Sequence, residues 1–169
     1  MKSRIVFLTA TFALFVIVFS ACKKESSGHS TLNIRLTDAP ADYQEVNVDL
    51  EGVTVKIADE SWIELDAVPG VYNLLGLQNG VDTLIATEVL PKGILQEIRL
   101  VLGTDNTIKV NGQTYPLVIP SGSESGLKIK VNKNLESSVE TLIIDFDAAL
   151  SVQQEGTEDY KLRPVLKIK

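Results

Sequence analysis

The chain of 169 residues contains one cysteine and one histidine, which are Cys22 and His29. A single cysteine excludes a disulfide bond within the chain, although export would permit one. A Ser-His-Asp or Cys-His arrangement needs a base beside its nucleophile, and neither residue is suitably placed for this role. The same shortage excludes zinc sites rich in histidine or cysteine. The sequence therefore predicts a protein that is not an enzyme.

Basic side chains are also scarce, because the chain has 16 Lys and Arg residues against 22 Asp and Glu residues, a net charge of −6. Removal of residues 1–21 would remove Lys2 and Arg4 and no acid, which leaves a charge of −8. Nucleic-acid binding needs a basic surface, so no nucleic-acid partner is expected. Charge alone would not draw such a chain to an anionic membrane either.

Long apolar runs are limited to one, Ile5–Phe19, which follows the basic residues Lys2 and Arg4. This run is shorter than the ~20 residues that span a bilayer, so it predicts a secretory signal peptide over residues 1–21. The segment Phe19-Ser20-Ala21-Cys22 resembles the lipobox of bacterial lipoproteins. The resemblance implies cleavage before Cys22 and acylation of that residue, with a palmitate-type anchor in a membrane. The alternative is an uncleaved membrane anchor.

Residues 22–30 are polar and small and show no periodicity, as expected for a flexible tether. No aspartate follows Cys22, which by analogy with enteric lipoproteins favours the outer membrane, on its periplasmic face or at the cell surface. Residues 31–169 are long enough to bury one core, so a single domain is expected.

Apolar and polar residues alternate along most of this domain, which is typical of half-buried strands. The alternating segments include residues 32–36, 46–50, 53–57, 98–102, 127–131, 142–150 and 160–168. Many short strands without a long helical period predict an all-β fold, a single antiparallel β-sandwich.

Three sequence features predict the ends and edges of strands. The alternation shifts by one residue at Glu51-Gly52, which predicts a β-bulge or a change of sheet. Asn111-Gly112 predicts a two-residue hairpin turn that pairs Val110 with Gln113. Pro164 has no N–H group, so an edge strand or a bulge is expected there. A further strand is expected over residues 71–77, whereas residues 83–86 suit either a strand or a helical turn.

Several ordered motifs in this domain resemble known families. Residues 69–75 and 90–94 look like turns of prealbumin-like and carboxypeptidase-regulatory-like sandwiches. Residues 36–42, 98–103, 120–122 with 125–128, and 145–147 resemble the DUF4382 family over residues 31–169. That family has no known function and is often found in bacterial lipoproteins. The resemblance implies a sandwich fold and an envelope location but no reaction.

Asp145 and Asp147 are two residues apart on an expected strand, so their side chains should share one face. They are candidates for glycoside hydrolysis, or for calcium binding together with Asp38 or Asp42. The favoured interpretation is a solvated face whose acids pair with basic residues of neighbouring strands. Trp62 could stack on a sugar ring, but a position in the core is favoured.

The resulting hypothesis is a lipid-anchored module of the cell envelope that has a structural role or binds a protein or glycan partner. The alternatives are a hydrolase that uses only acids, such as a glycosidase, and a calcium-dependent binding module. Apart from calcium, no cofactor is expected.

Overall fold

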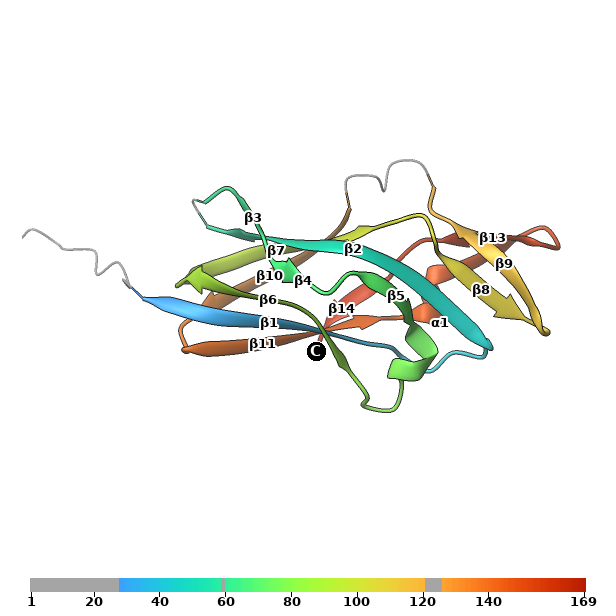
Figure 1. Cartoon of the computed structure of the whole chain (residues 1–169), viewed down its shortest axis with the longest axis horizontal. Helices are drawn as coiled ribbons and strands as arrows, with labels where there is room; N and C mark the ends of the chain where they lie inside the picture. Colours follow the sequence, from blue (N-terminus) through green and yellow to red (C-terminus); the bar gives the residue numbers. More distant parts are fainter. Residues whose placement is uncertain (1–27, 59, 121–125) are drawn as a thin grey trace, which may run out of the picture.

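The computed structural model describes residues 28–58, 60–120 and 126–169, and most of this part of the chain is β-structure. The strands form two sheets (Figure 1). The small sheet has the order β14 (Leu166–Ile168), β11 (Val139–Phe146), β1 (His29–Thr37), β6 (Thr83–Pro91) and β4 (Asp66–Ala67).

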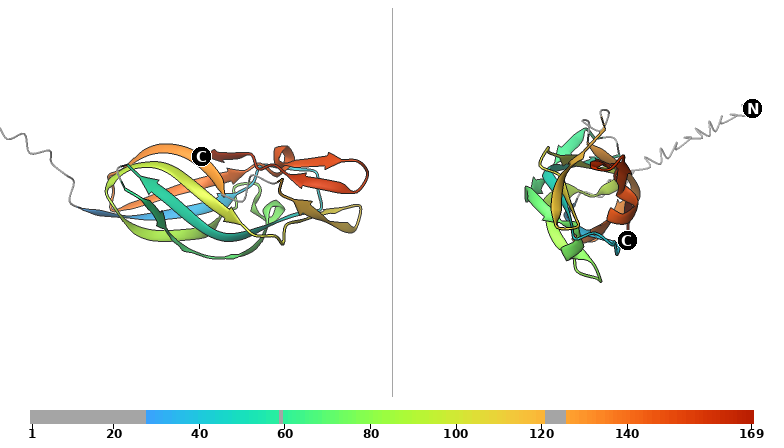
Figure 2. Two further views of the ribbon diagram at one scale, coloured as in Figure 1. Left: turned by 90° about the horizontal axis from the view of Figure 1, so that it is seen from above. Right: turned by 90° about the vertical axis from the view of Figure 1, so that its right-hand side faces the viewer.

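The large sheet has the order β10 (Leu127–Leu135), β7 (Gly93–Leu102), β2 (Glu45–Ile57), β8 (Thr107–Val110), β9 (Gln113–Val118), β13 (Asp159–Leu162) and β12 (Val152–Glu155). Two short strands, β3 (Trp62–Glu64) and β5 (Gly70–Asn73), also pair with β2. The only helical elements in the described ranges are η1 (Leu74–Leu77) and α1 (Ala148–Ser151). The sandwich is elongated, with the hairpins β8–β9 and β12–β13 at the end opposite the start of β1 (Figure 2).

The core lies between the two sheets and follows the alternation of the sequence. On β1, Leu32, Ile34 and Leu36 are buried, whereas Asn33 and Arg35 between them keep partial exposure. Successive side chains of a strand point to opposite faces, so every second residue reaches the core. The fold class predicted from this pattern, an all-β sandwich, is confirmed.

The sheets are not purely antiparallel, which corrects one part of the prediction. β1 runs parallel to β11, with Thr31 opposite Val139 and Thr37 opposite Asp145. β9 and β13 also form a short parallel pair. Parallel neighbours need a long crossover connection, and both pairs are separated by long stretches of chain. Alternation shows which residues face the core but not the direction of the neighbouring strand.

Two of the three predicted strand irregularities are confirmed, and the third is wrong. The register between β2 and β7 shifts between Leu50 and Gly52, as expected for a bulge. Asn111 and Gly112 have φ angles of 51° and 80°, and Val110 pairs with Gln113. Pro164 lies between β13 and β14 and belongs to no strand, so the edge strand or bulge predicted at this residue is wrong, and the alternating row of residues 160–168 is divided between the two sheets. Residues 83–86 belong to strand β6.

Two predicted strands end early because a side chain caps a helical turn. Asn73 accepts a hydrogen bond from the Leu75 backbone, so β5 ends and η1 begins. Asp147 accepts one from the Leu150 backbone, which starts α1. Leu150 is consequently 57% exposed and does not continue the row of buried residues on β11.

The first strand begins two residues before the predicted domain boundary. His29 and Ser30 belong to β1, and Ser30 is fully buried, so these two residues are not part of a tether. Cys22 and the predicted signal peptide lie outside the described residues, as do Ser121–Ser125 of the family motifs. None of the helices in the described ranges has the length and apolarity needed to cross a membrane.

Candidate functional site

The three candidate carboxylates lie at one end of the small sheet. Asp38 follows β1, and the parallel pairing of Thr37 with Asp145 places Asp38 near the end of β11, where Asp147 is found. Their exposed fractions are 2% for Asp38, 5% for Asp145 and 6% for Asp147. The expected solvated face is therefore wrong, because all three carboxylates are buried.

Asp38 connects the end of β1 to two other segments. Its Oδ1 accepts a hydrogen bond of 2.9 Å from the backbone N–H of Ala148, and its Oδ2 accepts one of 3.1 Å from Nε2 of Gln78. Burial raises the pKa of the Asp38 carboxyl above its ordinary value, although both hydrogen bonds act in the opposite direction. These contacts give Asp38 a structural role.

Basic residues of the C-terminal segment contact the other two carboxylates. Nζ of Lys167 lies 3.4 Å from Oδ2 of Asp147, and Nζ of Lys169 lies 3.2 Å from Oδ2 of Asp145. The expected pairing of these acids with basic residues of neighbouring strands is confirmed for Asp147, because Lys167 belongs to β14, which pairs with β11. The Oδ1 atom of Asp145 is buried and has no hydrogen-bond partner in the described part of the chain.

This arrangement favours a structural role over catalysis or metal binding. Across the described ranges, no group of three or more acidic, histidine or cysteine side chains is positioned to hold a metal ion. Calcium needs several oxygen ligands, and protein donors occupy most oxygens of Asp38 and Asp147. The calcium hypothesis for Asp38, Asp145 and Asp147 and the hydrolase hypothesis for Asp145 and Asp147 stay untested predictions.

The substitution Asp38→Ala should lower the free energy of unfolding by about 1–3 kcal/mol, because buried donors at Ala148 and Gln78 lose their acceptor. Asp38→Asn keeps an acceptor oxygen and should cost less. Urea unfolding at neutral pH measures both. Equal losses in the two variants would contradict the assigned role of the carboxylate as an acceptor.

The same residue should contribute a pH dependence. The pKa of Asp38 is raised in the folded state, so the unfolded chain releases this proton first as the pH rises. As the pH rises from the ordinary pKa of Asp38 to its raised folded pKa, the contribution of Asp38 to the free energy of unfolding should decrease. The stability of the unsubstituted protein relative to Asp38→Asn should therefore increase when the pH is lowered from 7 to 4.

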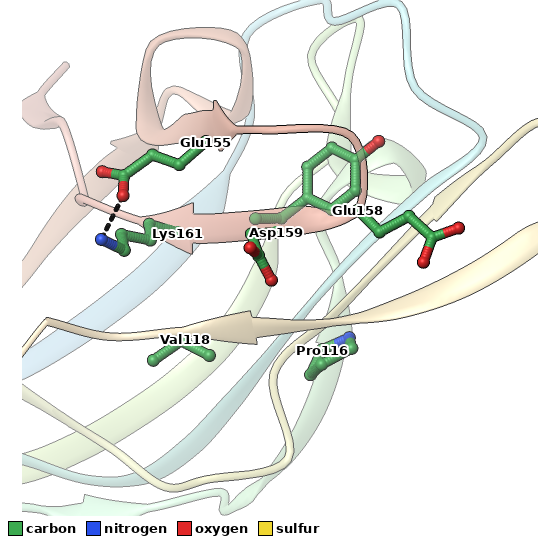
Figure 3. A pocket seen from close by; sticks show the side chains of 7 residues that line it. Pro116, Val118, Glu155, Glu158, Asp159 and Lys161 are labelled. Atoms are coloured by element: carbon green, nitrogen blue, oxygen red, sulfur yellow. Dashed lines mark hydrogen bonds and ion pairs between the residues drawn. The ribbon is translucent and has the colours of Figure 1, made fainter.

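A shallow pocket of about 190 Å³ lies between β9 and the β12–β13 hairpin (Figure 3). Its lining residues are Pro116, Val118, Glu155, Glu158, Asp159, Tyr160 and Lys161. Lys161 pairs with Glu155, so the single basic group is already neutralised. The volume is below the ~300 Å³ at which ligand pockets usually begin, and it does not favour a small-molecule site.

Trp62 lies on the outer surface of the large sheet, so the favoured interpretation of this residue as core is wrong. β3 pairs with β2 such that Ile63 is opposite Val55 and Trp62 is opposite Lys56. Paired residues of antiparallel strands project to the same face. Val55 is buried, and Lys56 projects outward together with Trp62.

Basic residues surround Trp62 on this surface. The guanidinium carbon of Arg99 lies 4.0 Å from the centroid of the indole ring, within the range of a cation–π interaction. The register places Lys56, Glu97 and Lys130 in one row and Thr54, Arg99 and Lys128 in the next. We define the Trp62 face as Thr54, Lys56, Trp62, Arg99, Lys128 and Lys130.

The basic residues of the Trp62 face differ from those elsewhere in their ion pairing. Of the twelve Lys and Arg residues in the described ranges, seven lie within 4.0 Å of an acidic group there. The five without such a pair are Lys56, Lys92, Arg99, Lys128 and Lys130. Four of these five belong to the Trp62 face.

Two polar atoms of the Trp62 face are buried without a hydrogen-bond partner among the described residues, Nε of Arg99 and Oγ1 of Thr54. Buried polar groups are normally satisfied, so each such atom calls for an explanation. The alternation over residues 127–131 already marked Lys128 and Lys130 as outward-facing. Their proximity to Trp62 depends on the pairing of β2, β3, β7 and β10, which the sequence pattern does not give.

The fold and this surface define an all-β sandwich with an aromatic and basic outer face. The chain belongs to the DUF4382 family, described as a domain of unknown function, whose model matches residues 29–164. Neither the curated proteins nor the solved structures contained a match to the chain. The match to the family model confirms the membership in the DUF4382 family that the sequence motifs predicted.

Proposed function

We propose that this protein is a lipid-anchored module of the bacterial envelope that binds a glycan through the Trp62 face and performs no catalysis. The observation that carries the proposal is the concentration, around a partly exposed tryptophan, of basic residues that form no ion pair with the other described residues. An indole ring presents an apolar surface to the C–H groups of a sugar, and neighbouring polar groups can bind its oxygens.

The location in the envelope is supported by the sequence of the N-terminal segment. The basic and apolar start, followed by Cys22 after small residues, favours export and acylation. The domain starts at His29, so only a few residues separate it from the proposed anchor. A module held in this way would meet the glycans of the envelope rather than diffuse away from them.

Affinity electrophoresis tests the glycan proposal. The purified full-length protein is run through gels that contain neutral or acidic polysaccharides. At least one polysaccharide should retard the protein, and Trp62→Ala should abolish the retardation, because the stacking surface is lost. Trp62→Phe keeps an aromatic ring and should retain part of the binding. Unchanged retardation of Trp62→Ala would overturn the assignment of this face.

A further inference from the structure

We infer that the Trp62 face recognises an acidic glycan, one that carries carboxylate or sulfate groups on its sugar rings. This inference rests on the proposed function, because it specifies the ligand of the same face. The charge of this face is opposite to that of the whole protein, which has a net charge of −6. Among the described residues, the register places two acids beside the four basic residues of the face, Glu64 and Glu97, so the basic residues are in excess there.

The positions of the basic groups suit a repeating anionic polymer. Arg99 is central, with Lys128 beside it on β10 and Lys56 one row away on β2. An arginine guanidinium binds carboxylate or sulfate oxygens through two parallel N–H groups. Lysines at the flanks would contact successive charged sugars, because the register places them on both sides of Arg99.

The Trp62 side chain supports a glycan rather than another anion. The Arg99 guanidinium lies over the Trp62 ring, so a ligand bound by this guanidinium would lie next to the apolar indole. A simple anion would use the basic groups without needing an indole ring. A sugar that bears an acidic group would use both features, the ring through stacking and the guanidinium through hydrogen bonds.

Binding assays with the purified full-length protein test this inference. The acidic polymers are polygalacturonate, alginate and chondroitin sulfate, and the neutral polymers are fully methyl-esterified polygalacturonate and dextran. The methyl ester has the same backbone as polygalacturonate without its charge. At least one acidic polymer should bind, at least tenfold more tightly than either neutral polymer, and the difference should shrink as salt is added. Arg99→Gln should weaken this binding at least tenfold.

Lys92→Gln provides the matched control, because Lys92 is the basic residue that, in the described part of the chain, has no ion pair and lies outside the Trp62 face. This variant should bind as the unsubstituted protein does. Equal binding of neutral and acidic polymers, lost in Trp62→Ala, would overturn the inference and leave the proposed glycan binding intact. Absence of binding to all five polymers would overturn both. Equal weakening by Lys92→Gln and Arg99→Gln would show nonspecific attraction of anions and would also overturn the inference.

Discussion

The substitution Phe146→Ala should lower the free energy of unfolding by about 3–5 kcal/mol. Phe146 is the last residue of β11, is 1% exposed, and is the largest of the fully buried side chains. Its removal would leave a cavity that neighbouring strands cannot fill without losing their pairing. β11 pairs with β1 and with the edge strand β14, so this cavity would lie at the end of the small sheet, next to the start of α1. Urea unfolding followed by circular dichroism measures the loss.

Val139→Ala is the matched control for this prediction. Val139 lies on the same strand but is 55% exposed, so its truncation should change the stability by less than about 0.5 kcal/mol. Similar losses in the two variants would show that β11 contributes through its backbone pairing alone. Such a result would contradict the packing of Phe146 between the two sheets.

Much of the fold could be predicted because alternation records burial directly. Each residue predicted to face inward on β1, from Leu32 to Leu36, is buried. Asn111-Gly112 fixes its hairpin locally, because its two positive φ angles specify the turn and therefore the register. The parallel pairing of β1 with β11 could not be predicted, since it joins segments more than a hundred residues apart in the chain.

The candidate site was predictable only in part, because its residues are brought together by strands that are distant in the sequence. The sequence identified Asp145 and Asp147 as candidates but predicted that they lie on a solvated face. Alternation assigns side chains that point away from the Phe146 side of the strand to the surface. The C-terminal residues and the turn into α1 cover that surface. The basic residues around Trp62 come from three other strands, and only the order of strands in the sheet brings them together.

The position of the Trp62 face relative to the proposed anchor has a functional consequence. β3 lies at the same end of the sandwich as the start of β1 (Figure 1). A fully extended chain spans at most about 3.6 Å per residue, so the short segment after Cys22 would keep this end close to a membrane. The proposed glycan ligand would then belong to the layer next to that membrane, which makes acylation of Cys22 decisive for function.

Cells grown with a clickable fatty acid should incorporate the label into the full-length protein, and Cys22→Ser should abolish the incorporation completely. Acylation requires the Cys22 thiol, and cleavage before this residue should also fail in the variant, which would then retain residues 1–21 and show a larger mass. Fluorescence of the labelled protein and intact-mass spectrometry measure the two effects. The double variant Cys22→Ser, Ser26→Cys restores a thiol nearby and should stay unlabelled, because the cut position determines which residue is modified. Labelling of Cys22→Ser would show that another residue carries the acyl chain and would contradict the prediction. An unsubstituted protein that keeps residues 1–21 and carries no label would instead support an uncleaved apolar anchor.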